Sequence, residues 1–401
     1  MFRRTFLLSS AAACIAPLRA ANSSLGTVAY VHQGDLWVRS LLDGTPKRLT
    51  NGRGIESPRF SPSGQWIACK NKDAIYVLST GGGSERQLQP GEFSWMPGRD
   101  VLVVAGGNRV GLIDAQNWVA STIVSGDADL PVFSPDGTQF AYATAVTTGR
   151  GHGGEPLRIG QIRIASLTHP EPRTLVSKYL TGFGPCLWTR DGKSLLYWED
   201  PDFSASVAAD GLELFRINAS GGPPESLRLT TLVHEDMISL SPVTNSLAVA
   251  AGGGRETWSG KRIAIVDLDR SAVRYATHDD TAALTPSWSP DGKQIALSAA
   301  SDVQKRRIWT IDISASANPS RLTNDDHYRD EHPLWSADGT HILFCRMDRA
   351  GKGMLWLMSA TGEYPNPVSA ELTLKTGIMG TAGFYGYLDW RRSFDWFRGP
   401  I

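Results

Sequence analysis

The sequence predicts an all-β fold of the β-propeller class, and three observations support this prediction. A short phrase built around Ser-Pro-Asp-Gly recurs along the chain, each copy precedes an alternating apolar run, and glycine and proline are scattered throughout. The 41 glycines and 23 prolines among 401 residues favour short strands and tight turns over long helices. A repeat of this kind predicts a ring of similar units instead of two or three unrelated domains.

The recurring phrase joins two neighbouring strands. An aromatic or leucine anchor ends the first strand, and a turn follows in which proline fixes φ, aspartate bonds nearby backbone and glycine takes a positive φ. In one clear copy, Trp288 precedes the turn 289–292 and the apolar run 295–297. Two further strands follow, here within 308–312 and 320–323, and four antiparallel strands make one propeller blade. The anchors are Phe60, Trp95, Phe133, Trp188, Leu240, Trp288 and Trp335.

These repeats resemble the WD40-like PD40 repeats of TolB-like propellers, which also occur in the propeller of prolyl-oligopeptidase-type peptidases. The resemblance covers nearly all of residues 21–401. A β-sandwich is the alternative fold, but sandwiches do not repeat one strand-turn-strand phrase in this way. The resemblance implies a protein-binding role at the cell envelope. The α/β domain that accompanies the propeller in TolB has no counterpart among these motifs, so no specific partner is carried over.

The anchor spacing predicts eight blades, with seven as the alternative if the weak copy at Trp95 or the tail is miscounted. Residues 27–50 supply three strands but no anchor. A C-terminal inner strand over Phe384 to Trp390 would complete this set and provide the eighth anchor. The two chain ends would then share one blade, which would close the ring and leave no open sheet edge.

Residues 1–20 are expected to be an export signal, followed by a single propeller domain over residues 21–401. Arg3 and Arg4 precede an apolar stretch that is too short to span a bilayer. The pair resembles a twin-arginine signal, and an ordinary Sec signal is the alternative. We therefore expect a periplasmic or otherwise exported protein. Cys14 lies in a weak lipoprotein-like box, which leaves a lipid anchor as a second option.

The composition and the absence of several motifs reduce the number of function classes that the sequence supports. Forty basic and forty acidic residues give a formal net charge of zero, so no global electrostatic argument points to nucleic acid or an anionic membrane. The nucleophile elbow of hydrolases, the P-loop and the H-E-x-x-H zinc motif do not occur. We expect a monomer without a resident cofactor that binds an envelope protein, a peptide or a small ligand. Outside the signal, the cysteines are expected to be buried free thiols: Cys69, Cys186 and Cys345.

One pattern indicates a binding site. In several repeats the segment that leads to the next anchor carries carboxylates and imidazoles, as at Asp127 and Asp129 before Phe133. In a propeller these segments emerge on one face, around the mouth of the central channel. We call the following set the candidate rim: His234, Glu235, Asp236, His278, Asp279, Asp280, Asp326, His327, Asp330, Glu331 and His332.

Three interpretations of the candidate rim stay open. Aspartate-rich turns and caps would account for the residues without any ligand. A ring of carboxylates would instead suit a cationic ligand or a basic peptide. A divalent metal would make the protein a propeller enzyme, for example of the lyase type, with ligands His234, His278, His327 and His332. In the long fourth repeat, the alternating Asp200 and Asp202 are typical of a calcium-binding loop, but the remaining residues of such a loop are missing.

The tail 390–398 is aromatic and basic. Exposed, it would suit docking to a partner or a membrane surface. Packing against the first blade is the simpler expectation.

Overall fold

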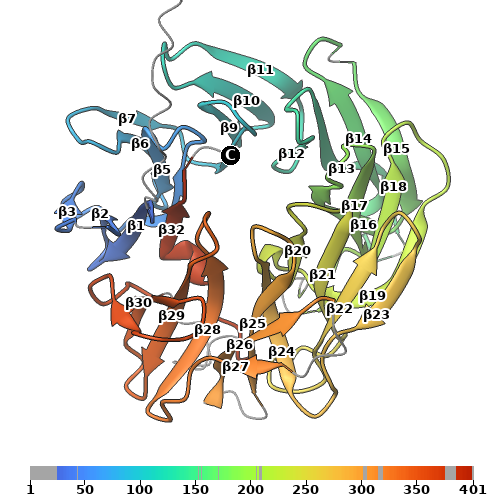
Figure 1. Cartoon of the computed structure of the whole chain (residues 1–401). Helices are drawn as coiled ribbons and strands as arrows, with labels where there is room; N and C mark the ends of the chain where they lie inside the picture. The colour runs from blue at the N-terminus through green and yellow to red at the C-terminus, as the bar shows by residue number, and fades with distance from the viewer. Residues whose placement is uncertain are drawn as a thin grey trace, which may run out of the picture.

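The computed structural model describes residues 25–399 except 43, 152, 155, 170, 205, 207–209, 301–304, 315–318 and 375–384. The expected signal at residues 1–20, including Cys14, therefore lies outside the described residues. Within them, the strands form six sheets of four strands and one sheet of eight. The sheets follow one another around a ring, as Figure 1 shows. No helix in this part of the chain is both long enough and apolar enough to cross a membrane.

The strands follow the chain from unit to unit. The first four units contain β1 (Thr27–His32), β2 (Asp35–Ser40), β3 (Lys47–Arg48); β4 (Glu56–Phe60), β5 (Trp66–Lys70), β6 (Ile75–Ser79), β7 (Glu85–Leu88); β8 (Glu92–Trp95), β9 (Val101–Ala105), β10 (Arg109–Asp114), β11 (Ala120–Ser125); β12 (Val132–Phe133), β13 (Gln139–Arg150), β14 (Pro156–Ser166) and β15 (Arg173–Tyr179).

The second half of the chain continues in the same order. Its strands are β16 (Thr181–Trp188), β17 (Ser194–Pro201), β18 (Gly211–Asn218), β19 (Glu225–Leu232); β20 (Ile238–Leu240), β21 (Ser246–Ala251), β22 (Arg262–Asp267), β23 (Ala272–Tyr275); β24 (Ala282–Trp288), β25 (Gln294–Ala300), β26 (Arg307–Asp312), β27 (Ser320–Arg321); β28 (Tyr328–Trp335), β29 (His341–Asp348), β30 (Gly353–Ser359) and β31 (Asn366–Pro367). The short helices η2 (Glu235–Met237) and η5 (Trp390–Arg392) and the strand β32 (Phe394–Phe397) complete the elements discussed below.

Every unit is a set of four antiparallel strands, and in all but the first unit these follow one another in chain order, as in β24-β25-β26-β27. The eight-stranded sheet divides into two such sets, β16 to β19 and β20 to β23, which are joined by one residue pair, Thr231 and Ala251. The pairings of the described strands thus give eight successive four-stranded units. Every predicted anchor from Phe60 to Trp335 is the last residue of the first strand of its unit.

The alternating strand direction gives the ring two different faces. Segments that connect one unit to the next emerge on one side, which we call the connector face. The turns between the first and second strands emerge on the opposite side, the turn face. In the turn after Trp288, Ser289 Oγ donates to Asp291 Oδ1 over 2.7 Å, and Asp291 accepts from the backbone N–H of Lys293 over 3.1 Å. The aspartate of the repeat therefore holds its own turn.

The ring is closed by the two ends of the chain. Strand β32 pairs antiparallel with β1, which gives the sheet order β3-β2-β1-β32. Figure 1 shows the red β32 beside the blue β1. The shared closing sheet is confirmed, and the tail packs against the first unit instead of extending outward.

The predicted position of the closing strand was wrong. Of the segment expected to be a strand, Phe384 lies outside the described residues, residues 385–389 form a turn and an isolated bridge, and Trp390 begins η5. Trp390 is buried, and its indole donates to Glu331 Oε2 over 2.8 Å instead of ending a strand. Phe397, at the end of β32, takes the anchor position and contacts the Phe60 ring at a centroid distance of 5.7 Å.

The core lies within the sheets and between neighbouring sheets. Between the first and second units, for example, Val31 and Leu36 belong to the same buried cluster as Ile67 and Leu78. The cysteines are free thiols, with Cys69 and Cys345 fully buried and Cys186 half-buried. The prediction of buried thiols is confirmed for two of the three.

Three inner strands contain the same irregularity. Ser57, Thr285 and His332 each have a positive φ, of 54°, 49° and 53°. Each lies three residues before an anchor and is followed directly by a proline. The strand pairing shifts by one residue at each of these positions, which is the signature of a β-bulge.

Candidate functional site

The structure separates the candidate rim into a central group and an exposed group. Connector residues near the ring centre are His234 and the η2 residues Glu235 and Asp236. Contrary to expectation, residues 330–332 lie within the inner strand β28 rather than in a connector, because pairing with β29 begins already at Tyr328. The exposed group lies on two separate connectors and comprises His278, Asp279, Asp280, Asp326 and His327.

The C-terminal segment Tyr385–Arg392 contacts residues of several units at the connector face. The guanidinium of Arg391 forms an ion pair with Glu235, in the connector to the sixth unit. The main-chain oxygen of the same Arg391 accepts a hydrogen bond from Arg59 Nη1, in the second unit, over 2.7 Å. The second and sixth units face each other in a ring of eight, so one residue bridges opposite sides of the ring.

A buried charged network fixes this segment. Glu331 forms ion pairs with Arg306 and with Arg329, whose Nη2 lies 2.6 Å from Glu331 Oε1. Arg306 and Arg329 also donate to the main-chain oxygen of Gly386, over 3.2 and 2.6 Å. Burial alone would raise the pKa of Glu331, but the charges of Arg329 and Arg306 outweigh it and hold that pKa below its ordinary value. Glu331 therefore serves the fold as an ionised carboxylate.

Asp330, the neighbour of Glu331, is neutralised in a different way. Its two carboxylate oxygens accept from Arg346 Nε over 2.7 Å and from Arg346 Nη2 over 2.9 Å, and both side chains are buried. This two-point contact is the strongest form of an arginine–carboxylate pair. Neither Asp330 nor Glu331 is thus available to an external cation.

The remaining central residues form an aromatic and acidic cluster. The Tyr387 hydroxyl donates to Asp236 Oδ1 over 2.9 Å, and His332 Nδ1 lies 3.3 Å from Asp236 Oδ2. The His234 ring stacks on the Tyr387 ring with 3.8 Å between centroids. Burial, followed by the charge of Asp236, raises the pKa of Tyr387 well above its ordinary value, so the phenol remains a hydrogen-bond donor. His332 also meets the Phe394 ring edge to face, at 5.7 Å.

The histidines proposed as metal ligands are not brought together. His278 and His327 are exposed on different connectors, whereas His234 and His332 contact Tyr387 and Phe394. Among the described residues, no group of three or more His, Cys, Asp and Glu side chains could hold a metal ion. The donor set of a metal-dependent propeller enzyme therefore does not fit this arrangement.

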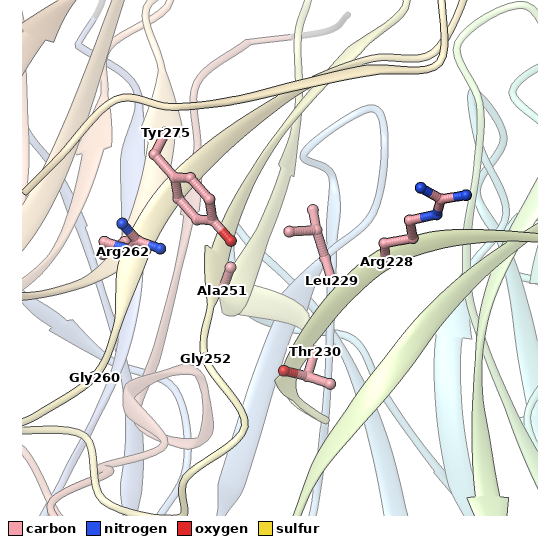
Figure 2. Close-up of a pocket in the computed structure, with 8 residues that line it drawn as sticks. All are labelled: Arg228, Leu229, Thr230, Ala251, Gly252, Gly260, Arg262 and Tyr275. Atoms are coloured by element: carbon pink, nitrogen blue, oxygen red, sulfur yellow. The ribbon is translucent and has the colours of Figure 1, made fainter. Parts of the chain in front are cut away.

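Among the residues that the structure describes, two of the cavities open on the connector face. The smaller, of about 130 Å³, lies at the seam where β19 meets β21, and Figure 2 shows Arg228 and Arg262 on opposite sides of it. The Arg262 guanidinium carbon lies 3.7 Å from the centroid of the Tyr275 ring, which also lines this cavity. The cavity is below the usual size of a ligand site. A Cβ at Gly252 would lie 2.0 Å from the main-chain oxygen of Gly260, so this close approach requires glycine.

The larger cavity, of about 380 Å³, lies between the fourth and fifth units. Asp127 and Asp129, which the sequence pattern singled out, line it together with Asp200. Sequence reasoning missed its aromatic walls, because Phe183 and Trp198 occupy strand positions that look like ordinary core.

Comparisons with known proteins agree on the fold. No family model matches the chain. Dipeptidyl peptidase 4 from Porphyromonas gingivalis aligns with a TM-score of 0.58 and 9% identity over 86% of this chain and 60% of that chain. A protein described as the eukaryotic initiation factor aligns with a TM-score of 0.52 and 14% identity over 86% and 97% of the two chains. TolB from Agrobacterium tumefaciens aligns with a TM-score of 0.37 and 15% identity over 85% and 86%.

At identities this low, the structural similarity shows a β-propeller fold and nothing finer. The chain spans 60% of the length of the dipeptidyl peptidase. The similarity to the dipeptidyl peptidase agrees, at the level of fold alone, with the resemblance of the repeats. Membership of the PD40 repeat family is not shown.

Proposed function

We propose that the chain is an exported β-propeller that acts as a binding scaffold at the cell envelope and recognises a basic segment of a partner protein through its connector face. One contrast carries the proposal. The central carboxylates Asp330 and Glu331 are paired with arginines of the same chain. Asp279 and Asp280 are exposed and form no ion pair with a described residue.

Electrostatics explains why this contrast matters. Carboxylates that are already paired contribute little field outside the molecule, whereas exposed unpaired ones attract cationic partners and raise the association rate. His278 beside Asp279 extends this exposed surface, whereas the exposed Asp326 is already paired with Arg307 over 2.7 Å. Since Arg391 bridges the ring centre, we place the partner on the face of the ring rather than inside it. The arginine pair and apolar stretch of residues 1–20 support export.

The test is affinity capture from a periplasmic extract of the source organism with immobilised residues 21–401. The test variant is Asp279→Asn/Asp280→Asn. Its matched control is Glu171→Gln/Glu363→Gln, which removes two exposed carboxylates from the turn face. We expect a protein that the wild type and the control retain, that the test variant retains severalfold less, and that added salt releases. Equal retention by the test variant and the control would contradict the proposed surface.

A further inference from the structure

The cavity between the fourth and fifth units has the composition of a ligand site. Its volume of about 380 Å³ falls within the range of about 300 to 1,000 Å³ that is usual for small-molecule sites. Strands β16 and β17 and the loop after β17 supply three aromatic rings to it, and β17 and the connector before β12 supply three carboxylates. These lining residues are Phe183, Trp198, Phe203, Asp127, Asp129 and Asp200.

The aromatic walls are suited to the apolar part of a cation. Phe183 and Trp198 are buried, and Phe203 is half-buried. The guanidinium carbon of Arg158 lies 5.6 Å from the centroid of the Phe203 ring, so this ring already contacts a cationic group. The indole Nε1 of Trp198 is buried without an acceptor among the described residues. An occupant that brings an oxygen atom to this edge would satisfy it.

The carboxylates of this cavity lack the arginine partners found at the ring centre. Asp127, Asp129 and Asp200 form no ion pair with any residue that the structure describes, whereas the neighbouring Asp210 lies 2.7 Å from Arg255 Nη2. Asp129 is exposed as a residue, but partial desolvation of its carboxylate, and then the charge of Asp127, raise its pKa. Burial, followed by the charges of Asp210 and Asp202, raises the pKa of Asp200. The fold therefore leaves a deficit of positive charge at this position.

A glycine keeps the space beside Asp200 open. A Cβ at position 182 would lie 3.2 Å from Asp200 Oδ2 and 3.2 Å from Phe203 Cδ1. These distances are tighter than ordinary contacts, so Gly182 preserves the gap between a carboxylate and an aromatic ring. Asp200 Oδ1 accepts from the backbone N–H of Ser204 over 3.0 Å, which holds the carboxylate in place.

We propose that this cavity binds a small organic cation, with its ammonium group at Asp129 and Asp200 and its apolar body against Phe183 and Trp198. Three unpaired carboxylates disfavour an anion. A bare metal ion does not fit, because no group of three or more suitable donors converges among the described residues. The inference goes beyond the proposed scaffold function, since it concerns a small molecule and residues other than Asp279 and Asp280.

The experiment uses three probes of one shape and different charge. Calorimetric titration of residues 21–401 compares 2-phenylethylammonium, neutral 2-phenylethanol and anionic 3-phenylpropanoate. We expect saturable binding of the cation, binding of the alcohol weaker by about tenfold or more, and no binding of the anion, because a charged hydrogen bond contributes about 1.5 to 3 kcal/mol. No binding of the cation, or equal binding of the alcohol, would overturn the proposal.

Substitutions of the lining carboxylates test whether the cation binds in this cavity. The Asp129→Asn/Asp200→Asn variant is expected to bind the cation about tenfold or more weakly than the wild type. The Asp279→Asn/Asp280→Asn variant is expected to bind it with unchanged affinity. Should Asp200→Asn disturb the turn at Ser204, Asp129→Asn alone at its exposed position provides the same test, with thermal unfolding as the check on folding. Unchanged binding in a folded Asp129→Asn/Asp200→Asn protein, or an equal loss in the Asp279/Asp280 variant, would contradict the assignment. Partner capture does not depend on Asp129 or Asp200, so the two proposals fail separately.

Discussion

The indole Nε1 of Trp335 donates a hydrogen bond to the main-chain oxygen of Ser287, 3.1 Å away in the preceding unit. Ser287 is the residue before Trp288, which is the anchor of that unit. Every other tryptophan anchor repeats this relationship with the residue before the previous anchor, at 3.0 Å in each case: Trp95 to Arg59, Trp188 to Val132 and Trp288 to Ser239. The anchors thus link neighbouring units as well as filling their own.

The first prediction concerns this link. Trp335→Phe is expected to lower the free energy of unfolding by about 1 to 3 kcal/mol, because it leaves the Ser287 oxygen buried without its donor. Phenylalanine is the natural anchor at Phe60 and Phe133, so the ring itself is tolerated. Urea unfolding measures the effect. Trp309→Phe is the control, since the Trp309 indole nitrogen has no acceptor among the described residues. A control loss as large as the Trp335→Phe loss would show that ring size, and not the hydrogen bond, matters.

The second prediction concerns the buried charge network. Glu331→Gln is expected to lower the free energy of unfolding by about 3 to 5 kcal/mol, because Arg306 and Arg329 would remain buried without a counter-charge. Glu371→Gln breaks an exposed 3.7 Å contact with Lys352 and should cost less than about 1 kcal/mol. Thermal and urea unfolding compare the two variants. Similar losses in both would mean that the central network does not stabilise the ring.

The third prediction is the pH dependence of that network. The folded protein holds the pKa of Glu331 below its ordinary value, so this carboxylate contributes stability above its unfolded pKa. The contribution is lost as pH falls through the lowered folded value. The difference in unfolding free energy between wild type and Glu331→Gln should therefore be largest near neutral pH and shrink on acidification. Urea midpoints measured from neutral to acidic pH test this, and a difference that grows in acid would have the wrong sign.

The fourth prediction concerns export. Arg3→Lys/Arg4→Lys keeps the positive charge of residues 1–20 but removes the arginine pair. A twin-arginine route should lose nearly all export of a reporter fused to these residues, because it requires the arginines themselves. Fractionation of periplasm and cytoplasm measures the outcome. Unchanged export of the variant would assign the Sec route instead.

Much of the fold could be predicted from the sequence because its signals are local. The Pro-Asp-Gly turns and the alternating runs placed the anchors from Phe60 to Trp335 correctly, and the three-strand segment at residues 27–50 indicated a closing strand. The position of that strand could not be predicted. The apolar residues near Trp390 alternate as a strand would, and the contact of Trp390 with Glu331, far away along the chain, is not visible in the sequence.

The candidate site was harder to predict, since its character depends on pairing across the ring. The sequence pattern found the carboxylates of the connector face, but it could not distinguish Asp330, which Arg346 neutralises, from Asp279, which is exposed. The partner arginines lie in strands or loops with no motif of their own. The proline directly after His332 was an unused signal: prolines at the same position, two residues before the anchor, follow the positive-φ residues Ser57 and Thr285.

Closure of the ring by its own two ends is the central structural claim, and a cross-link between them tests it most directly. Thr27 of β1 faces Phe397 of β32, and opposed residues of antiparallel strands bring their Cβ atoms within about 4.5 to 5.5 Å, near disulfide range. Oxidised Thr27→Cys/Phe397→Cys protein should yield a disulfide-linked peptide pair by mass spectrometry, whereas Thr27→Cys/Tyr364→Cys should not. Two freely alkylated cysteines at positions 27 and 397 in a folded protein would contradict the closed ring.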